Sequence, residues 1–510
     1  MIHRIIVKKL QNISTQARLA FICFSLVGTF FSSANAQQPA VKEWTFLVYM
    51  NADNNLYKYG FLNIAQMEKL GSTDKVNLIV QMDHGDSATP TTRYYITRNP
   101  NPVTGKITSQ VLQTMGETNM GDPKTLSEFL TWGVQKYPAK RYAVIIWNHG
   151  SGWEGVSYDD NPQAHLTLPN VRKALEVGQS AIGSQRRGTR QAARFDIINF
   201  DACLMSALEI AYELKDVGQY LVGSQFNEPG EGENYTTFLA PLIAQPQKSA
   251  KELAEIMVYQ YALAYKGSSS INYAAIDLNR VQGFSSLLNQ SSQAMAASSL
   301  KGALRDSFGA GSFDLITAFT RAQMVGKADP KVQQSLDQLL MAYGYPQDFQ
   351  QSLSRGASLA GRKIITRTFP GVVYFKAGGS VNQVALKLDQ NNLYTAEIPQ
   401  QTTQYTVQRQ VQAGLRGESR QWKESTSTFL RQGNDPIVYH NAFPETSPLI
   451  ADAYTFSTKG AHGMTLYSLA GASASLSAPS RNIGRGILNE YKQLLFASQG
   501  APAWTAFFGF

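Results

Sequence analysis

The sequence has 510 residues, a formal net charge of +9 and 43% hydrophobic residues. This length and composition are typical of a globular protein with two or three domains. The excess of positive charge is small for the length, which argues against a dedicated nucleic-acid or membrane-binding surface. We therefore expect no nucleic-acid partner.

The first 36 residues predict a secretory signal peptide. Basic residues precede an apolar segment from Leu19 to Phe31, and Ala34-Asn35-Ala36 supplies a small-x-small cleavage site. Cleavage after Ala36 lowers the net charge to +5, because the segment contains four basic residues and no acidic one. The alternative for this segment is a membrane anchor, which needs about 20 apolar residues. In the rest of the sequence no unbroken apolar stretch approaches that length. We expect a secreted or periplasmic protein without stable membrane insertion after signal removal.

Apolar runs and helical patterns alternate through the next hundred residues. The patterns predict strands at 43–50 and 76–82, with a helix at 61–70 between them. Residues 93–97 predict a short edge strand, and Asp122-Pro123 predicts the start of a helix that runs to about residue 136. This alternation indicates βαβ units in a mostly parallel sheet flanked by helices, so the predicted fold class is α/β.

Two further apolar runs, 142–146 and 195–201, predict buried parallel strands. The first is followed by His149 and the second by Cys203. Open α/β sheets bind ligands at the carboxyl ends of their strands, so the two side chains are candidates for one site. The polar, basic segment 183–191 between the runs predicts an exposed loop, of the kind in which proteolytic cuts concentrate.

After the cysteine, apolar residues at helical spacing predict a helix that begins at or just after Cys203. A strand at 220–224 then leads into an acidic loop at 225–234. Two helical patterns surround a predicted strand at 271–276. From about residue 361 the alternating segments indicate an antiparallel, β-rich region, and a strand and a helix are predicted between 463 and 497.

Cysteine usage points to a reactive thiol. The sequence has two cysteines, and loss of the signal peptide removes Cys23, so only Cys203 remains in the mature chain. An exported protein with one thiol has no internal disulfide, and the remaining thiol is a candidate nucleophile. The alternative is an inert, buried cysteine.

The surroundings of Cys203 favour the nucleophile. A nucleophilic cysteine needs a base or ion-pair partner, and His149 fits that role. Gly150 has no side chain to shield its backbone N–H, so this amide and that of Cys203 are candidate donors to an oxyanion.

Other chemistries have weaker support. The sequence contains no G-x-S-x-G, H-E-x-x-H, C-x-x-C or P-loop motif. The remaining mature histidines lack metal-ligand spacing, so no metal site is predicted from them. The acidic turns 83–86 and 159–161 offer oxygens to a calcium ion, although acidic turns are more common than ion sites.

Four segments resemble the clostripain family of cysteine peptidases: W-T-F-L-V-Y-M-N-A-D-N-N-L at 44–56, W-N-H-G-S-G-W at 147–153, F-D-A-C-L-M at 200–205 and S-Q-F-N-E-P-G at 224–230. The resemblance implies a caspase-like fold with His149 and Cys203 as the catalytic dyad. It also implies a peptidase domain at 37–360 with helical insertions, then a β-rich subdomain at 361–455. Residues 456–510 would pack back on the peptidase domain.

Related family members cleave after Arg or Lys, and several cut themselves between the catalytic residues. A cationic substrate side chain needs a carboxylate at the base of its pocket. Asp201 is the favoured candidate, because the family motif has an aspartate there; Glu228, Glu231 and Glu233 are alternatives. The resemblance also makes the loop with Arg186, Arg187 and Arg190 a candidate for self-cleavage, with an ordinary surface loop as the alternative. No cofactor is required by the sequence, and calcium dependence is known in part of the family.

The main hypothesis is a secreted cysteine endopeptidase acting on protein or peptide substrates after Arg or Lys. One alternative is an exported binding protein that retains the fold without turnover. Another is an acyl-transferring enzyme that uses the same dyad to join peptides.

Overall fold

The computed structural model describes residues 41–85, 89–188, 192–265, 271–308 and 311–344, strand segments between 363 and 455, and residues 463–468 and 488–508. The predicted signal peptide and Arg190 lie outside these residues. Residues 41–510 form one compact unit. No helix in the described ranges combines the length and apolarity that a bilayer crossing requires.

The centre of the sheet consists of five parallel strands. They are β1 (Lys42–Asn51), β2 (Val76–Asp83), β5 (Ala139–Trp147), β8 (Phe195–Asp201) and β9 (Gly218–Gly223), in the spatial order β2-β1-β5-β8-β9. Almost every residue of β1, β2 and β8 is buried, as expected for parallel strands covered on both faces. The prediction of an α/β fold with a mostly parallel central sheet is confirmed.

Antiparallel strands extend the sheet on both sides. The predicted strand at 93–97 is present as β3 (Thr92–Tyr95), which pairs with β2. It is not the edge strand, because β4 (Gln110–Thr114) pairs with its other side. On the other side, β10 (Asn272–Asp277) pairs with β9 and β20 (Leu449–Thr455). The sheet continues through β19 (Ile437–His440), β18 (Gln421–Leu430), β17 (Gln404–Ala413), β13 (Gly371–Ala377) and β14 (Ser380–Ala385).

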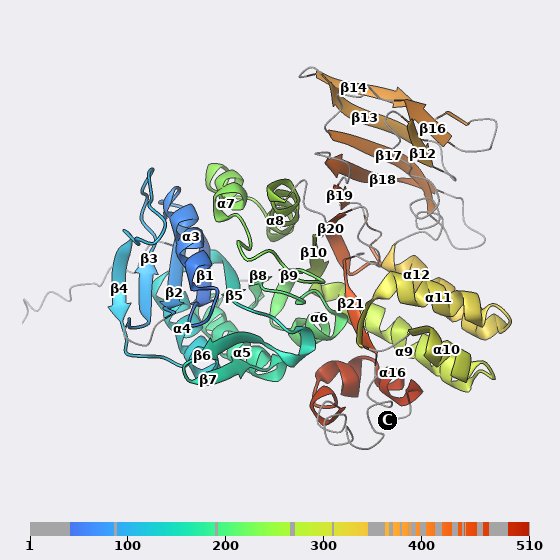
Figure 1. The fold of residues 1–510 in the computed structure, drawn as a ribbon, viewed down its shortest axis with the longest axis horizontal. Helices are drawn as coiled ribbons and strands as arrows, with labels where there is room; N and C mark the ends of the chain where they lie inside the picture. The colour runs from blue at the N-terminus through green and yellow to red at the C-terminus, as the bar shows by residue number, and fades with distance from the viewer. Residues whose placement is uncertain are drawn as a thin grey trace, which may run out of the picture. The chain divides into compact units, whose positions relative to one another are not determined.

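Helices cover both faces of the parallel strands (Figure 1). One face carries α4 (Pro123–Lys136), α5 (Leu168–Gln185) and α6 (Leu208–Leu214), and the other carries α3 (Tyr57–Glu68), α7 (Tyr235–Ala244) and α8 (Ala250–Ala264). Successive residues of β1 alternate between the two cores: Leu47 and Tyr49 belong to the first, whereas Val48 and Met50 belong to the second. This alternation follows from the two-residue repeat of a strand.

The remaining elements lie outside this sheet and the six helices that cover it. They are the helices α9 (Val281–Ala297), α10 (Lys301–Phe308), α11 (Leu315–Gly326), α12 (Pro330–Tyr343) and α16 (Pro502–Phe507), the short helical turns at Gly152–Glu154, Leu278–Arg280 and Phe496–Gly500, and the strands β6 (Val156–Asp160), β7 (Gln163–Leu166), β11 (Gly311–Asp314), β12 (Lys363–Thr366), β15 (Lys387–Leu388), β16 (Tyr394–Glu397) and β21 (Thr465–Ser468). Trp504 of α16 is fully buried and donates its indole N–H to the Tyr467 carbonyl of β21 at 3.0 Å. The final helix and strand therefore contribute to the main core.

Candidate active site

The site is built where β5 and β8 end side by side. The last residues of the two strands are paired in register, Trp147 with Asp201, and the Asn148 amide donates to the Asp201 carbonyl at 3.3 Å. His149 lies two residues beyond Trp147, and Cys203 lies two residues beyond Asp201. Equal offsets from a paired position in parallel strands bring the two residues to the same edge of the sheet.

Gly150 confirms that the two strand ends touch. A Cβ atom at this position would lie 2.2 Å from the Cys203 carbonyl oxygen, which no real contact permits. Only glycine therefore lets the chain after His149 lie directly against the cysteine backbone.

The predicted helix start at Cys203 is wrong, because α6 begins at Leu208. Residues 202–207 instead form a turn in which Leu204 adopts a positive φ of 67°. The Leu204 amide donates to the Phe226 carbonyl at 3.0 Å, and the Ser206 amide donates to the Ser224 carbonyl at 2.7 Å. Bonds to the loop after β9 replace the first helical turn, so the cysteine lies on a turn without a helix beneath it.

The same loop supplies a donor to the thiol. The backbone N–H of Glu228 points at the Cys203 sulfur across 3.2 Å. Cys203 itself is partly exposed.

A buried carboxylate cluster lies below the cysteine. Asp201 is 4% exposed and accepts hydrogen bonds from the Glu233 amide at 3.0 Å and the Tyr235 hydroxyl at 2.8 Å. Burial raises the pKa of Asp201 to about 6. The backbone of Gly232, which has a φ of +60°, contacts this side chain. A Cβ atom at this position would lie 2.4 Å from Oδ1 of Asp201, so only glycine fits.

Two glutamates complete the cluster. Burial, reinforced by the neighbouring Asp201 carboxylate, raises the pKa values of Glu228 and Glu233 well above their usual range. Glu233 accepts a 2.5 Å hydrogen bond from the Asn199 amide group, whereas neither carboxyl oxygen of Glu228 has a well-formed hydrogen bond. No Lys or Arg in the described part of the chain forms an ion pair with the three acids. Glu231, by contrast, is exposed.

His149 is half-buried, and this burial lowers its pKa, partly opposed by the charge of Asp160. Its Nε2 atom lies 2.7 Å from Oδ1 of Asn55 in the turn after β1. Asn55 was not among the predicted site residues. The signal for it is an asparagine just after the strand that neighbours the one leading to the histidine.

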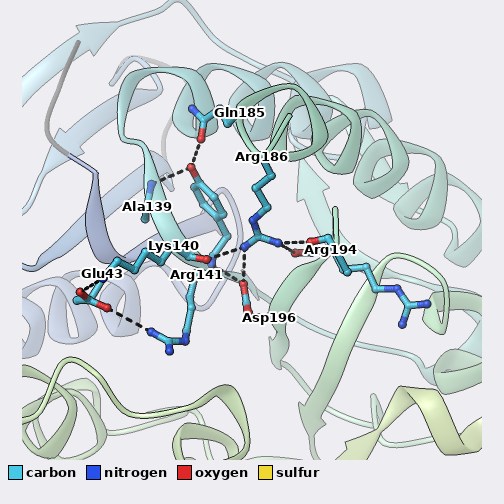
Figure 2. Close-up of polar contacts among 10 residues, drawn as sticks. Glu43, Ala139, Lys140, Arg141, Gln185, Arg186, Arg194 and Asp196 are labelled. Atoms are coloured by element: carbon cyan, nitrogen blue, oxygen red, sulfur yellow. Dashed lines mark hydrogen bonds and ion pairs between the residues drawn. The ribbon is translucent and has the colours of Figure 1, made fainter. Parts of the chain in front are cut away.

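Two of the candidate cleavage-loop arginines, Arg186 and Arg187, lie in the described residues and differ in environment. Helix α5 continues to Gln185, three residues into the predicted loop, and Arg186 is buried. Its guanidinium contacts the first residues of β5 and β8, where it pairs with Asp196 at 3.1 Å and donates to the Lys140 carbonyl at 2.8 Å (Figure 2). It also donates to the carbonyls of Ala192 and Arg194. Arg187 is exposed.

The acidic turns considered for calcium lie near each other, and Asp86 of the first turn lies outside the described residues. The charge of Asp159 contributes to raising the pKa of Asp83 to about 8, an effect due mainly to burial. In the residues that the structure describes, no three His, Cys, Asp or Glu side chains are arranged to hold a metal ion.

The mostly parallel sheet and its covering helices define an α/β protein of caspase-like architecture. The profile of the Clostripain family matches residues 48–444 of the sequence. The chain therefore belongs to the clostripain family.

Two relatives illustrate this membership. Clostripain of Hathewaya histolytica is 30% identical over 191 residues, which span 34% of this chain and 36% of that protein. The X-ray structure of a secreted C11 cysteine protease from Bacteroides thetaiotaomicron, in complex with an irreversible peptide inhibitor, is 16% identical. It superimposes with a TM-score of 0.50 over 91% of this chain and 99% of that chain, which supports the same fold.

The environment of Arg186 generates a stability prediction. Replacing Arg186 with Ala removes the partner of the largely buried Asp196 carboxylate and of three backbone carbonyls, so we expect a loss of about 3–5 kcal/mol in the free energy of unfolding. Arg187→Ala, at an exposed neighbouring position, is the matched control and should change it by less than about 0.5 kcal/mol. Denaturant unfolding of catalytically inactive protein measures both values. Equal stabilities for the two variants would contradict the anchoring role of Arg186.

Proposed function

We propose that the chain is a secreted cysteine endopeptidase that cleaves peptide bonds after Arg or Lys. The observation that carries the proposal is the in-register ending of β5 and β8, which brings His149 and Cys203 to one edge of the sheet above the buried acids. Membership of the clostripain family supports the same reaction class. Export follows from the signal peptide predicted at residues 1–36.

In the proposed reaction His149 takes the proton of the Cys203 thiol, and the thiolate attacks the carbonyl carbon of the scissile bond. The imidazolium then gives its proton to the leaving amine as the C–N bond breaks, which leaves a thioester on Cys203. A water molecule, deprotonated by His149, hydrolyses the thioester and restores the thiol. The amides of Gly150 and Cys203 are the proposed donors to the oxyanion that forms in both steps.

The carboxylate cluster supports a preference for cationic side chains. The carboxyl groups of Asp201, Glu228 and Glu233 are buried together, and no Lys or Arg of the described residues pairs with them, so their ionised forms are unfavourable until a positive charge enters. An Arg or Lys side chain of the substrate supplies that charge. We place Asp201 and Glu228 at the base of the pocket, because Glu228 has unpartnered carboxyl oxygens. Glu231, being exposed, lies at most at the rim.

The first test removes the nucleophile. Cys203→Ala should abolish cleavage of reporter peptides that end in Arg or Lys, because no other thiol remains in the mature chain. Cleavage is followed by release of a fluorescent amine, with an unchanged unfolding temperature as the folding control. Retained turnover would refute the cysteine mechanism. An inactive wild-type protein whose Cys203 resists thiol-reactive peptides would instead favour the non-catalytic binding protein.

The second test removes the charge of the pocket. Asp201→Asn and Glu228→Gln should each lower kcat/KM for Arg substrates by about 30-fold or more, the cost of leaving a buried cation unpaired. Glu231→Gln should have a much smaller effect.

The pH dependence of the wild type gives an independent check. Because burial raises the pKa of Asp201 to about 6, this carboxyl is neutral below that pH and ionised above it. KM for an Arg substrate should therefore rise as the pH falls through 6. A pH-independent KM, together with an unchanged Arg preference in both variants, would contradict the assigned pocket.

We further propose that the chain cuts itself in the segment 186–191, between the two catalytic residues. Arg187 is exposed and available as the residue before the cut, whereas the guanidinium of Arg186 is held in internal contacts. The contacts of Arg186 with the Arg194 carbonyl and the Asp196 carboxylate support continued association of the two fragments after a cut at Arg187 or Arg190.

Mass spectrometry of the purified protein tests the position of the cut. The double variant Arg187→Ala, Arg190→Ala should remain a single chain, and the wild type should yield two fragments that co-purify. The Cys203→Ala variant should also stay intact and serves as the control for cleavage by another protease. A cut that persists in the double variant, or one mapped after Arg186, would overturn this assignment.

A further inference from the structure

We propose that Asn55 is a positioning residue of the catalytic pair: its side-chain amide fixes the His149 ring so that Nδ1 receives the proton of Cys203. This proposal rests on the proposed function of the same site. It assigns a role to a residue outside the predicted dyad.

The contact itself determines which nitrogen carries the proton. Oδ1 of Asn55 lies 2.7 Å from Nε2 of His149, within hydrogen-bond distance. An amide oxygen only accepts hydrogen bonds, so the ring must present N–H at Nε2. A neutral imidazole has one N–H and one lone pair, and the lone pair is then on Nδ1. The tautomer that can deprotonate a thiol through Nδ1 is the one that Asn55 stabilises.

A neutral partner also suits the charge balance of the ring. Burial lowers the pKa of His149, and the charged group that opposes this effect is Asp160 of β6. The group from the turn after β1 that contacts the ring is the uncharged Asn55, and Cys203 follows the strand that pairs with β5. A carboxylate at position 55 would favour imidazolium and remove the base at neutral pH. An amide orients the ring without that cost.

The turn that carries Asn55 is held rigidly against the loop that carries His149. Asn148 donates from Nδ2 to the Asn51 carbonyl at 2.6 Å and to the Tyr158 carbonyl at 2.9 Å. Asn54 donates to the same Tyr158 carbonyl at 3.0 Å, and its Oδ1 accepts from the Leu56 amide at 2.9 Å.

These bonds join the end of β1, the end of β5 and strand β6 into one unit. Asn148 also accepts from the Tyr158 amide at 2.9 Å, so its whole side chain is used in the connection. Asn55 is exposed, so its own burial does not fix it. The rigid turn sets its position relative to the ring, as precise orientation of a catalytic base requires.

The kinetic test replaces Asn55 and compares it with a distant asparagine. Asn55→Ala should lower kcat by about 10–100-fold with little change in KM, because the ring is misoriented while substrate contacts remain. Asn101→Ala, at an exposed position between β3 and β4, is the matched control and should retain full activity. An unchanged kcat in Asn55→Ala would overturn the proposal.

A second variant keeps the acceptor and changes its charge. Asn55→Asp should raise the pKa of His149, so the acidic limb of the kcat/KM profile should move to higher pH by about one unit. A merely structural role for the side chain would leave this limb in place, and that result would count against the proposal even if activity falls.

Two readouts separate this proposal from the peptidase assignment. In Cys203→Ala protein, nitrogen NMR of His149 should show a proton on Nε2, and the Asn55→Ala change should mix the two tautomers. In protein with its thiol intact, Asn55→Ala should slow alkylation of Cys203 by iodoacetamide near neutral pH. Both measurements are independent of turnover. A proton on Nδ1 in the parent protein would refute the assignment, whether or not the chain is a peptidase.

Discussion

The site depends on the parallel pairing of β5 with β8. This pairing places Trp147 opposite Asp201, and the chain then continues in step for two residues to His149 and Cys203. A shift of one residue would turn one of the two side chains to the other face of the sheet. Both strands are buried on both faces, so a shift of one residue would move each side chain from one hydrophobic core to the other. The register is therefore well determined. The stability of the sheet and the geometry of the catalytic pair therefore have a common origin.

The loop after β9 connects the sulfur to the acids beneath it. Its backbone gives a hydrogen bond from Glu228 to the Cys203 sulfur, and its side chains add two buried carboxyls to that of Asp201. Burial disfavours the ionised forms of these carboxyls, and in the proposed function a substrate cation recovers part of that cost. In this account one segment both positions the nucleophile and selects the substrate. The same segment determines the path of residues 202–207 through its hydrogen bonds to Leu204 and Ser206.

The sequence predicted the strands and the α/β class, because buried parallel strands leave long apolar runs. It also placed His149 and Cys203 after two strands that the structure pairs, whereas their role as a dyad stays a prediction. It did not predict the turn at Cys203, since apolar spacing there suits a helix and the competing hydrogen bonds come from residues 224–226. It also could not show that the carboxyl group of Glu228 becomes buried, because Asn-Glu-Pro-Gly-Glu has the composition of a solvated loop. The sequence contained one signal for the ion pair of Arg186, namely the charged Asp196 within a mostly apolar strand. For Asn55 the sequence contained no signal beyond its position after β1, because its contact with His149 joins residues 94 positions apart.

The central claim is that the thiol, the imidazole and the buried acids act on one substrate residue. The most direct test is a crystal structure of the chain after reaction with an inhibitor peptide. The peptide ends in a lysyl ketone that carries a group displaced by thiols. The account predicts a covalent bond from Cys203 to the ketone-derived carbon, with His149 beside it and the lysine ammonium ion against Asp201 and Glu228. A peptide bound elsewhere, or a lysine side chain directed away from these carboxylates, would contradict the account.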